Sequence, residues 1–378
     1  TPPGPVPPGP VPPPIPDFRN EVPVDIVLPA LANRLGLGTL GTYHDRIGDD
    51  YPAPVQPAEP IICKAPSKDG GCAVPAAVAA EMQPTRAAWG RLFGETGSVD
   101  FDATNPAGAV NNIVEHGPSY DFDMYGLQAG MDLLRRLNED GSRDIAGFYI
   151  GVGRITADVD AVLGGPAGTS SVNGYSLGGY WTRIAEKGWY VDAVLQATWY
   201  DAEGNAEGRG RFAGESFDTD GWGFAASLEG GYPFDLGNGW SVEPQAQLVY
   251  QHVSLDDGSD AFARIDYDAT DALYGRLGGR LTKDWLTESA KRMTAWGKAD
   301  VWSGFGASAT TTFSGPAGGN PISFDTDIGG TWGSVGLGLQ GEVKKNVTMF
   351  ASGDYNFGLG GDGDFDSWSG RIGIKVKW

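Results

Sequence analysis

Alternation of apolar and polar side chains with a period of two residues, sustained over ten residues or more, is the feature that most restricts the fold of this chain. The final segment, 367–378, divides its side chains between two faces: apolar Trp368, Ile372, Ile374, Val376 and Trp378, and cationic Arg371, Lys375 and Lys377. The same division recurs at 189–200, 222–229 and 273–281. Such alternation predicts β-strands with one apolar and one polar face.

Twelve strands of this kind are predicted. We place them at 88–97, 120–135, 144–157, 171–185, 189–200, 220–232, 240–253, 269–282, 292–308, 326–342, 347–357 and 368–378. Many exceed the roughly five to six residues usual in globular proteins and suit strands that cross a membrane at a tilt.

The connections between these strands alternate in length. Long connections are predicted at 98–119, 158–170, 201–219, 254–268, 309–325 and 358–367, whereas most of the others are tight, as at 186–188 and 344–346. Long loops at one end and short turns at the other are typical of an outer-membrane barrel. A soluble β-sandwich would have no reason to show this alternation.

Composition excludes several other classes. The chain has 27 Lys and Arg against 48 Asp and Glu, so its net charge of −21 excludes a nucleic-acid binder with a basic surface. Its 59 glycines in 378 residues are about twice the usual share and disfavour a helical enzyme. No apolar run is long enough for a membrane-spanning helix. In a closed barrel, however, small inward residues leave room in the lumen.

We therefore predict an all-β fold, a 12-stranded antiparallel transmembrane β-barrel, occupying residues 88–378. A charge on the lipid face costs about 2–4 kcal/mol near the midplane for Arg or Lys, so charged strand residues should face the lumen. The predicted lumen-facing residues are Glu229, Arg276, Arg280, Glu342, Asp354, Arg371 and Lys375. The tryptophans predicted to form interfacial girdles are Trp89, Trp181, Trp189, Trp199, Trp240, Trp296, Trp332, Trp368 and Trp378.

The N-terminal part divides into three segments. Residues 1–21 form a Pro-rich linker, extended as polyproline II, which suggests that something precedes Thr1. Residues 22–47 carry apolar residues at helical spacing, and a helix over 25–47 would be about 34 Å long, close to a bilayer's thickness of about 30 Å. Because twelve strands enclose room for one helix, we predict a pore helix. Residues 48–87 form a connection in which the bonding of Cys63 and Cys72 is left open.

Three segments together resemble the translocator domain of Gram-negative autotransporters of the pertactin-like kind: FRNEVPVDIVLPALANRLGLGTLGTYHDRIGDD from Phe18, AAWGRLFGETG from Ala87, and the terminal aromatic strand. The resemblance implies a barrel in the outer membrane, plugged by a helix, with its N-terminal linker facing the extracellular side. The implied pore-helix residues are Leu31, Asn33, Arg34, Leu35, Gly36, Gly38, Asp45 and Arg46. The implied signal for the barrel-assembly machinery is Ile374, Val376 and Trp378.

Some members of this family release their passenger by a reaction of a pore-helix asparagine that precedes a small residue. Here Asn33 precedes Arg34, and the Asn111–Asn112 pair lies in a predicted surface loop. The resemblance therefore does not imply self-cleavage within this barrel.

Other motifs fit their contexts poorly. The GxGxxG match at 36–41 lies inside a helical pattern and follows no strand, which disfavours dinucleotide binding. The GxSxG match around Ser176 is followed by another strand rather than a helix. His44, His116 and His252 are too few and too scattered for a metal cluster. The acidic loops 255–268 and 361–366 could take up divalent cations, although solvated loop charge is the simpler interpretation.

We expect an outer-membrane translocator that exports an N-terminal passenger, with no catalytic residue, metal or cofactor of its own. The expected partners are outer-membrane lipid, the barrel-assembly machinery and the upstream passenger, with no nucleic acid and a monomeric state. One alternative is an outer-membrane channel or adhesin barrel without a passenger, and another is a hydrolase barrel that uses Ser176. The sequence leaves open what the passenger is and whether it is cleaved.

Overall fold

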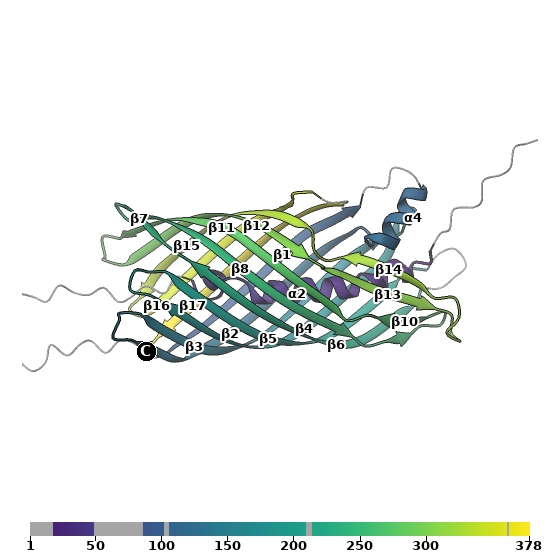
Figure 1. Cartoon of the computed structure of the whole chain (residues 1–378), viewed down its shortest axis with the longest axis horizontal. Helices are drawn as coiled ribbons and strands as arrows, with labels where there is room; N and C mark the ends of the chain where they lie inside the picture. The colour runs from purple at the N-terminus through teal and green to yellow at the C-terminus, as the bar shows by residue number, and fades with distance from the viewer. Residues whose placement is uncertain (1–17, 49–85, 102–105, 209–213, 361–362) are drawn as a thin grey trace, which may run out of the picture.

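The chain folds into a closed antiparallel β-barrel (Figure 1). The computed structural model describes residues 18–48, 86–101, 106–208, 214–360 and 363–378. The barrel strands are β1 (Ala87–Phe101), β2 (Tyr120–Leu137), β3 (Arg143–Asp160), β4 (Pro166–Ile184), β5 (Tyr190–Ala206), β6 (Ser216–Gly231), β8 (Trp240–Leu255), β11 (Thr270–Leu286), β12 (Arg292–Phe305), β15 (Thr331–Lys344), β16 (Val347–Gly358) and β17 (Gly363–Lys377). Pairing of β1 with β17 and of β8 with β11 closes the ring. This confirms the predicted twelve-stranded antiparallel barrel.

The two ends of the barrel differ. The short-turn end holds the tight turns, the C-terminus and the small strand β7 (Phe234–Gly237), which extends the hairpin with β8 (Figure 1). The opposite end, called the long-loop end, holds most of the remaining connections. Two of the predicted long connections are short, because β3 continues to Asp160 and β17 begins at Gly363. These strands are therefore longer than the stretches of alternating apolar and polar residues that predicted them.

The long-loop end carries structure that the sequence did not predict. A four-stranded sheet there has the order β14 (Ile322–Asp327), β13 (Ser308–Ser314), β10 (Arg264–Tyr267) and β9 (Gly258–Ser259). The helix α4 (Pro106–Glu115) packs beside β14 and contains the asparagine pair placed in a loop. The predicted strand 326–342 was wrong at its start, because residues 326–327 belong to β14 and the barrel strand begins at Thr331.

In the central part of strands such as β11, apolar side chains face outward and charged ones face inward. On β11, Leu277 is 71% exposed while its neighbour Arg276 is 2% exposed. The tryptophan prediction was partly wrong: Trp89 and Trp296 are buried inside the barrel, and Trp332 lines a lumen cavity. Each of these three lies an even number of positions from an inward residue on its strand, as Trp89 lies two positions from Arg91. The alternation of side chains along the strand therefore turns all three inward.

The lumen contains three helical segments in place of one continuous helix: α1 (Glu21–Ile26), α2 (Leu28–Leu40) and α3 (Tyr43–Ile47). The chain turns at Gly41, whose φ of 62° favours glycine, and Thr42 caps α3. The prediction of one continuous helix over residues 22–47 was therefore wrong. Within the described residues no helix is both long and apolar enough to cross a membrane. Most of the linker (residues 1–17) and of the connection (49–85), with Cys63 and Cys72, lies outside the described residues.

Candidate functional site in the barrel lumen

The helices α1, α2 and α3 together, called the helical segment, lie inside the barrel and pack mainly against one side of its wall. The helix α2 packs mainly against β3, β4, β5 and β8 (Figure 1). Leu31 and Leu35 are fully buried in an apolar cluster that includes Ile155 and Val172 of the wall. A Cβ at Gly174 would lie 2.9 Å from Leu35, so a wall glycine makes room for this leucine. The lumen near the long-loop end is therefore apolar rather than uniformly polar.

The helix glycines let α2 approach the wall closely. A Cβ at Gly36 would lie 2.2 Å from Nε2 of Gln251, and one at Gly38 would lie 2.6 Å from the methyl group of Met124. Glycine costs a helix about 0.5–1 kcal/mol relative to alanine. The close contacts with the wall offset this cost.

Amide and guanidinium groups of the wall donate hydrogen bonds to helix carbonyls. Arg91 and Gln128 both donate to the Thr39 carbonyl, at 2.7 and 2.8 Å. Gln251 donates to the Asn33 carbonyl at 2.8 Å, and Gln247 donates to the Gly41 carbonyl at 3.2 Å. The carbonyls of the last turn of a helix lack partners within it, and the wall supplies partners to those of Thr39 and Gly41, while the Asn33 carbonyl receives its wall donor in the middle of α2.

These wall donors were missed by the list of predicted lumen-facing residues, which contained only charged side chains of other strands. Gln245, Gln247 and Gln251 alternate with apolar residues on β8, and this pattern was the available signal. A neutral amide that is exposed to lipid without a partner is also costly, although less so than a charge. Their position on the polar face of the alternating pattern, rather than charge alone, identifies them as inward residues.

The middle of α2 contacts two opposite parts of the wall. The Tyr274 hydroxyl donates to Oδ1 of Asn33 at 2.6 Å. Arg34 pairs with Glu95 of β1, and its guanidinium lies over the rings of Phe122 and Phe365, at 4.2 and 4.6 Å. Because Phe122 belongs to β2 and Phe365 to β17, Arg34 contacts three adjacent strands that include the first and the last.

At the short-turn end, α3 is fixed by a buried ion pair. Arg46 donates to both carboxylate oxygens of Asp192, at 3.0 and 2.6 Å, and both side chains are at most 3% exposed. The guanidinium also lies 4.6 Å from the ring centre of Tyr180. The backbone N–H of Tyr43 donates to Glu229 at 2.8 Å. Two-point pairing of this kind fixes both the position and the rotation of α3.

The structure brings most of the other predicted charged residues into two neighbouring clusters. In one, Asp45 lies 3.6 Å from Arg371 and 3.8 Å from Lys298, and both cations also pair with Asp354. In the other, Arg276 pairs with Asp300 at 2.9 Å and with Glu229 at 3.1 Å. Lys298 and Asp300 were not among the predicted residues, although both alternate with apolar neighbours on β12.

The remaining predicted residues lie nearer the short-turn end. Arg280 lies 4.4 Å from the Trp296 ring centre and 3.3 Å from Nδ1 of His44. Lys375 is 1% exposed, and Glu342 is half-buried. The three residues of the predicted C-terminal assembly signal face outward: Ile374, Val376 and Trp378 are 42%, 37% and 52% exposed.

A cavity of about 240 Å³ runs along the opposite side of α2. Its walls come from β11, β12, β15, β16 and β17, with smaller parts of β1 and β2, and it reaches as deep as Asp45 and Arg371. Trp302 and Trp332 lie on its wall as a parallel stack with ring centres 5.6 Å apart. The helical segment therefore fills the lumen incompletely and off its axis.

The sites suggested by short motifs do not assemble. Ser176 lies within β4, and its hydroxyl is hydrogen-bonded to Thr198 at 2.9 Å. The glycines at 36–41 belong to α2 and its end, so they open no helix. In the part of the chain that the structure describes, no group of three His, Cys, Asp or Glu residues is placed to hold a metal ion.

Asp25 on α1 gives the docking of the helical segment a pH dependence. Burial raises the pKa of this carboxyl well above its usual range, and nearby Asp260 and Glu21 raise it further, while Tyr267 contacts the Asp25 main-chain carbonyl. An exposed carboxyl ionises near pH 4, so docking of α1 should weaken as pH rises from about 4 to the raised pKa and then level off. Asp25→Asn should remove this dependence and strengthen docking at neutral pH.

Hydrogen exchange of the α1 amides, corrected for intrinsic rates and measured between pH 5 and pH 8, checks this prediction. Asp218→Asn, at an exposed position on β6, is the matched control and should keep the wild-type pH dependence. An α1 whose protection does not change with pH in the wild type would contradict the prediction.

Comparison with known proteins agrees with this architecture. The family model described as "Autotransporter beta-domain" matches residues 88–354, well over half of the chain. The adhesin BmaC autotransporter of Brucella suis is 27% identical over 90% of this chain and 9% of its own length. The pertactin autotransporter of Bordetella bronchiseptica is 28% identical over 77% of this chain and 29% of its own length. The chain thus spans less than a third of these relatives.

Solved structures share the fold. The transport unit of the autotransporter AIDA-I from Escherichia coli matches with a TM-score of 0.63 at 16% identity, covering 79% of this chain and 92% of that one. The beta domain of the Bordetella autotransporter BrkA matches with a TM-score of 0.58 at 23% identity, covering 78% of this chain and all of that one. With a matching family model, a closed twelve-stranded barrel and a helical segment in its lumen, this chain belongs to the autotransporter beta-domain family.

Proposed function

We propose that this chain is a translocator that anchors an upstream passenger and exports it to the cell surface. Autotransporter beta-domains are integral barrels of the outer membrane and are not enzymes. The observation that carries the proposal is the buried path of residues 18–48, which run through the lumen from the long-loop end to the short-turn end. Such a path joins any upstream polypeptide to the far side of the membrane through the barrel itself.

In this proposal the long-loop end and the N-terminal linker face the cell exterior. Two observations support the orientation. Long loops of outer-membrane barrels lie on the extracellular side. In addition, Phe18, the first described residue, packs edge-on against Phe324 of β14, which belongs to the long-loop end.

The helical segment 22–47 acts as a plug that remains in the lumen after export. Its docking rests on Leu31 and Leu35, on the close approach at Gly36 and on the ion pairs of Arg46 and Asp45. Lipid contacts the outward apolar band, and Ile374, Val376 and Trp378 are the residues that the barrel-assembly machinery recognises. Because the barrel leaves no strand edge unpaired, one copy suffices.

Surface accessibility of an epitope tag tests the proposal. A tag fused ahead of residue 1, in a protein targeted to the outer membrane, should be cleaved by protease added to intact cells. The matched control is the same tag inserted in the short turn at 287–291, which should be protected until the cells are opened. A protected N-terminal tag would contradict export.

Conductance separates the translocator from a channel that lacks a passenger. In planar bilayers the complete chain should show low conductance, and deletion of residues 22–47 should raise it. A stable open pore that does not change on this deletion would favour the channel.

A further inference from the structure

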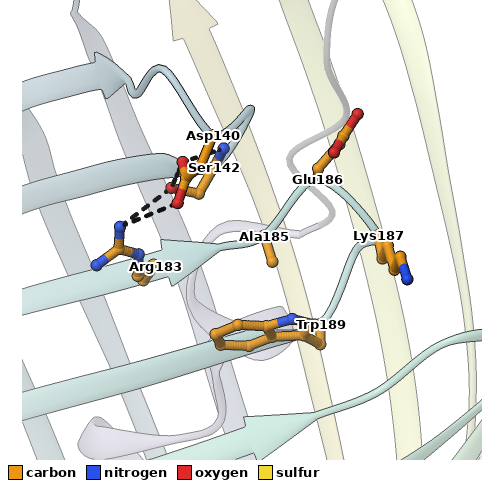
Figure 2. A pocket seen from close by; sticks show the side chains of 7 residues that line it. All are labelled: Asp140, Ser142, Arg183, Ala185, Glu186, Lys187 and Trp189. Atoms are coloured by element: carbon orange, nitrogen blue, oxygen red, sulfur yellow. Dashed lines mark hydrogen bonds and ion pairs between the residues drawn. The ribbon is translucent and has the colours of Figure 1, made fainter.

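A pocket on the outer rim of the short-turn end plays no part in the plugged lumen. It has a volume of about 480 Å³ and lies between the β2–β3 turn and the β4–β5 turn (Figure 2). Two cations, Arg183 and Lys187, two carboxylates, Asp140 and Glu186, and the indole of Trp189 line it. Its charges sum to zero, yet both signs are present.

The two turns that form the pocket are held by their own hydrogen bonds. Asp140 accepts from the backbone N–H and the hydroxyl of Ser142, at 3.0 and 2.6 Å. In the other turn, Ala185 donates to the Trp189 carbonyl at 2.8 Å, and Gly188 adopts a φ of 89°. The pocket is therefore preformed, and a ligand would not have to order it.

Arg183 of the pocket is only loosely engaged by its neighbours. Arg183 is half-buried and lies 3.7 Å from Asp140 and 3.8 Å from Asp144, which is too long for a hydrogen bond, and it donates to Ser142 at 3.2 Å. Figure 2 shows Lys187 on the side of the pocket opposite to Arg183. Hydrogen bonds from Ser142, with Arg183 nearby, lower the pKa of Asp140, so this carboxyl is ionised at neutral pH.

The position of Trp189 puts the pocket at the level of lipid headgroups. Trp199 and Trp189 are 55% and 37% exposed. They are about ten residues apart, which at roughly 3.3 Å per residue and a strand tilt of roughly 35–45° amounts to about 25 Å along the barrel axis. This equals the usual height of the apolar band of an outer-membrane barrel, so each tryptophan lies at one border of the band.

We propose that this pocket binds a phospholipid whose headgroup carries a phosphate and a primary ammonium group, as in phosphatidylethanolamine. Arg183 and Lys187 pair with the phosphate, and Asp140 and Glu186 accept from the ammonium. The acyl chains pass over Trp189 toward the apolar band. A net anionic headgroup would leave the carboxylates opposed to like charge, and a quaternary ammonium has no N–H to donate.

Native mass spectrometry of the complete chain tests this proposal. The protein is released from micelles that contain equal amounts of phosphatidylethanolamine, phosphatidylcholine and phosphatidylglycerol. We expect phosphatidylethanolamine to be retained preferentially. Equal retention of either other lipid would overturn the proposal, as would soluble phosphoethanolamine binding as well as the lipid.

Variants locate the binding. Arg183→Gln combined with Lys187→Gln should lower the retained fraction roughly tenfold. Lys344→Gln, which removes one exposed cation from another turn of the same rim, is the matched control and should leave retention unchanged. Heat-modifiable gel mobility shows that each variant is folded. Wild-type retention by the double variant, or an equal loss in the control, would overturn the assignment.

Discussion

Arg46→Ala should weaken the docking of α3 by about 3–5 kcal/mol, because it leaves the buried carboxylate of Asp192 without its cation. The pair is formed by two hydrogen bonds, and both side chains are almost fully shielded from water. A shift of this size exceeds a factor of a hundred in the docking equilibrium. Hydrogen exchange of the α3 amides measures the shift, and single-channel recording should show openings that the wild type lacks.

The double variant Arg46→Met with Asp192→Leu distinguishes the ion pair from simple loss of volume. Removing both charges leaves no unpaired buried charge, although the buried Thr182 hydroxyl loses its acceptor on Asp192, so most of the docking should return. Arg136→Ala removes an exposed arginine at the short-turn end and should change docking by less than about 0.5 kcal/mol. An Arg46→Ala protein with wild-type exchange and conductance would show that the pair does not hold the plug.

Leu277→Arg should destabilise the folded barrel in lipid by about 2–4 kcal/mol, because position 277 faces outward near the middle of the apolar band. Leu277 is 71% exposed, the next inward residue, Arg276, is buried and paired, and Leu273 and Leu281 continue the outward row. Reversible unfolding in urea from lipid vesicles measures the change in free energy.

The matched control is Leu236→Arg. Leu236 is 60% exposed on β7, beyond the short-turn border of the band, where an arginine should cost at most about 1 kcal/mol. Equal effects at the two positions would contradict the placement of the lipid band. A larger loss of stability for Leu277→Arg than for Leu236→Arg would support this placement, and the test requires no passenger.

Strand positions were predictable because alternation is imposed locally. A residue on a strand faces opposite to its neighbours, so Leu277 and Arg276 take opposite sides whatever the rest of the chain does. The same rule, applied strictly, would have turned Trp89 inward with Arg91. Its position near a strand end suggested a girdle, but parity decided its direction.

The break at Gly41 was less predictable. Gly36, Gly38 and Gly41 all interrupt the helical pattern, and sequence gives them similar weight. In the structure the wall supports the first two, since Gln251 and Met124 fill the space beside them. At Gly41 the chain turns, and Thr42 and Asp45 form a capping box that starts a new helix. That capping pattern was present in the sequence and was masked by the apolar spacing.

By itself, the sequence determined the barrel, its strand number and the inward or outward direction of most strand residues, because period-two patterning and connection length act over a few neighbouring positions. Only the tertiary structure decided that the plug leans on β3, β4, β5 and β8, that Arg46 meets Asp192, and that a small sheet and α4 cover the long-loop end. These arrangements depend on which residues far apart in the chain come within contact distance after the ring closes, and no local pattern encodes that choice.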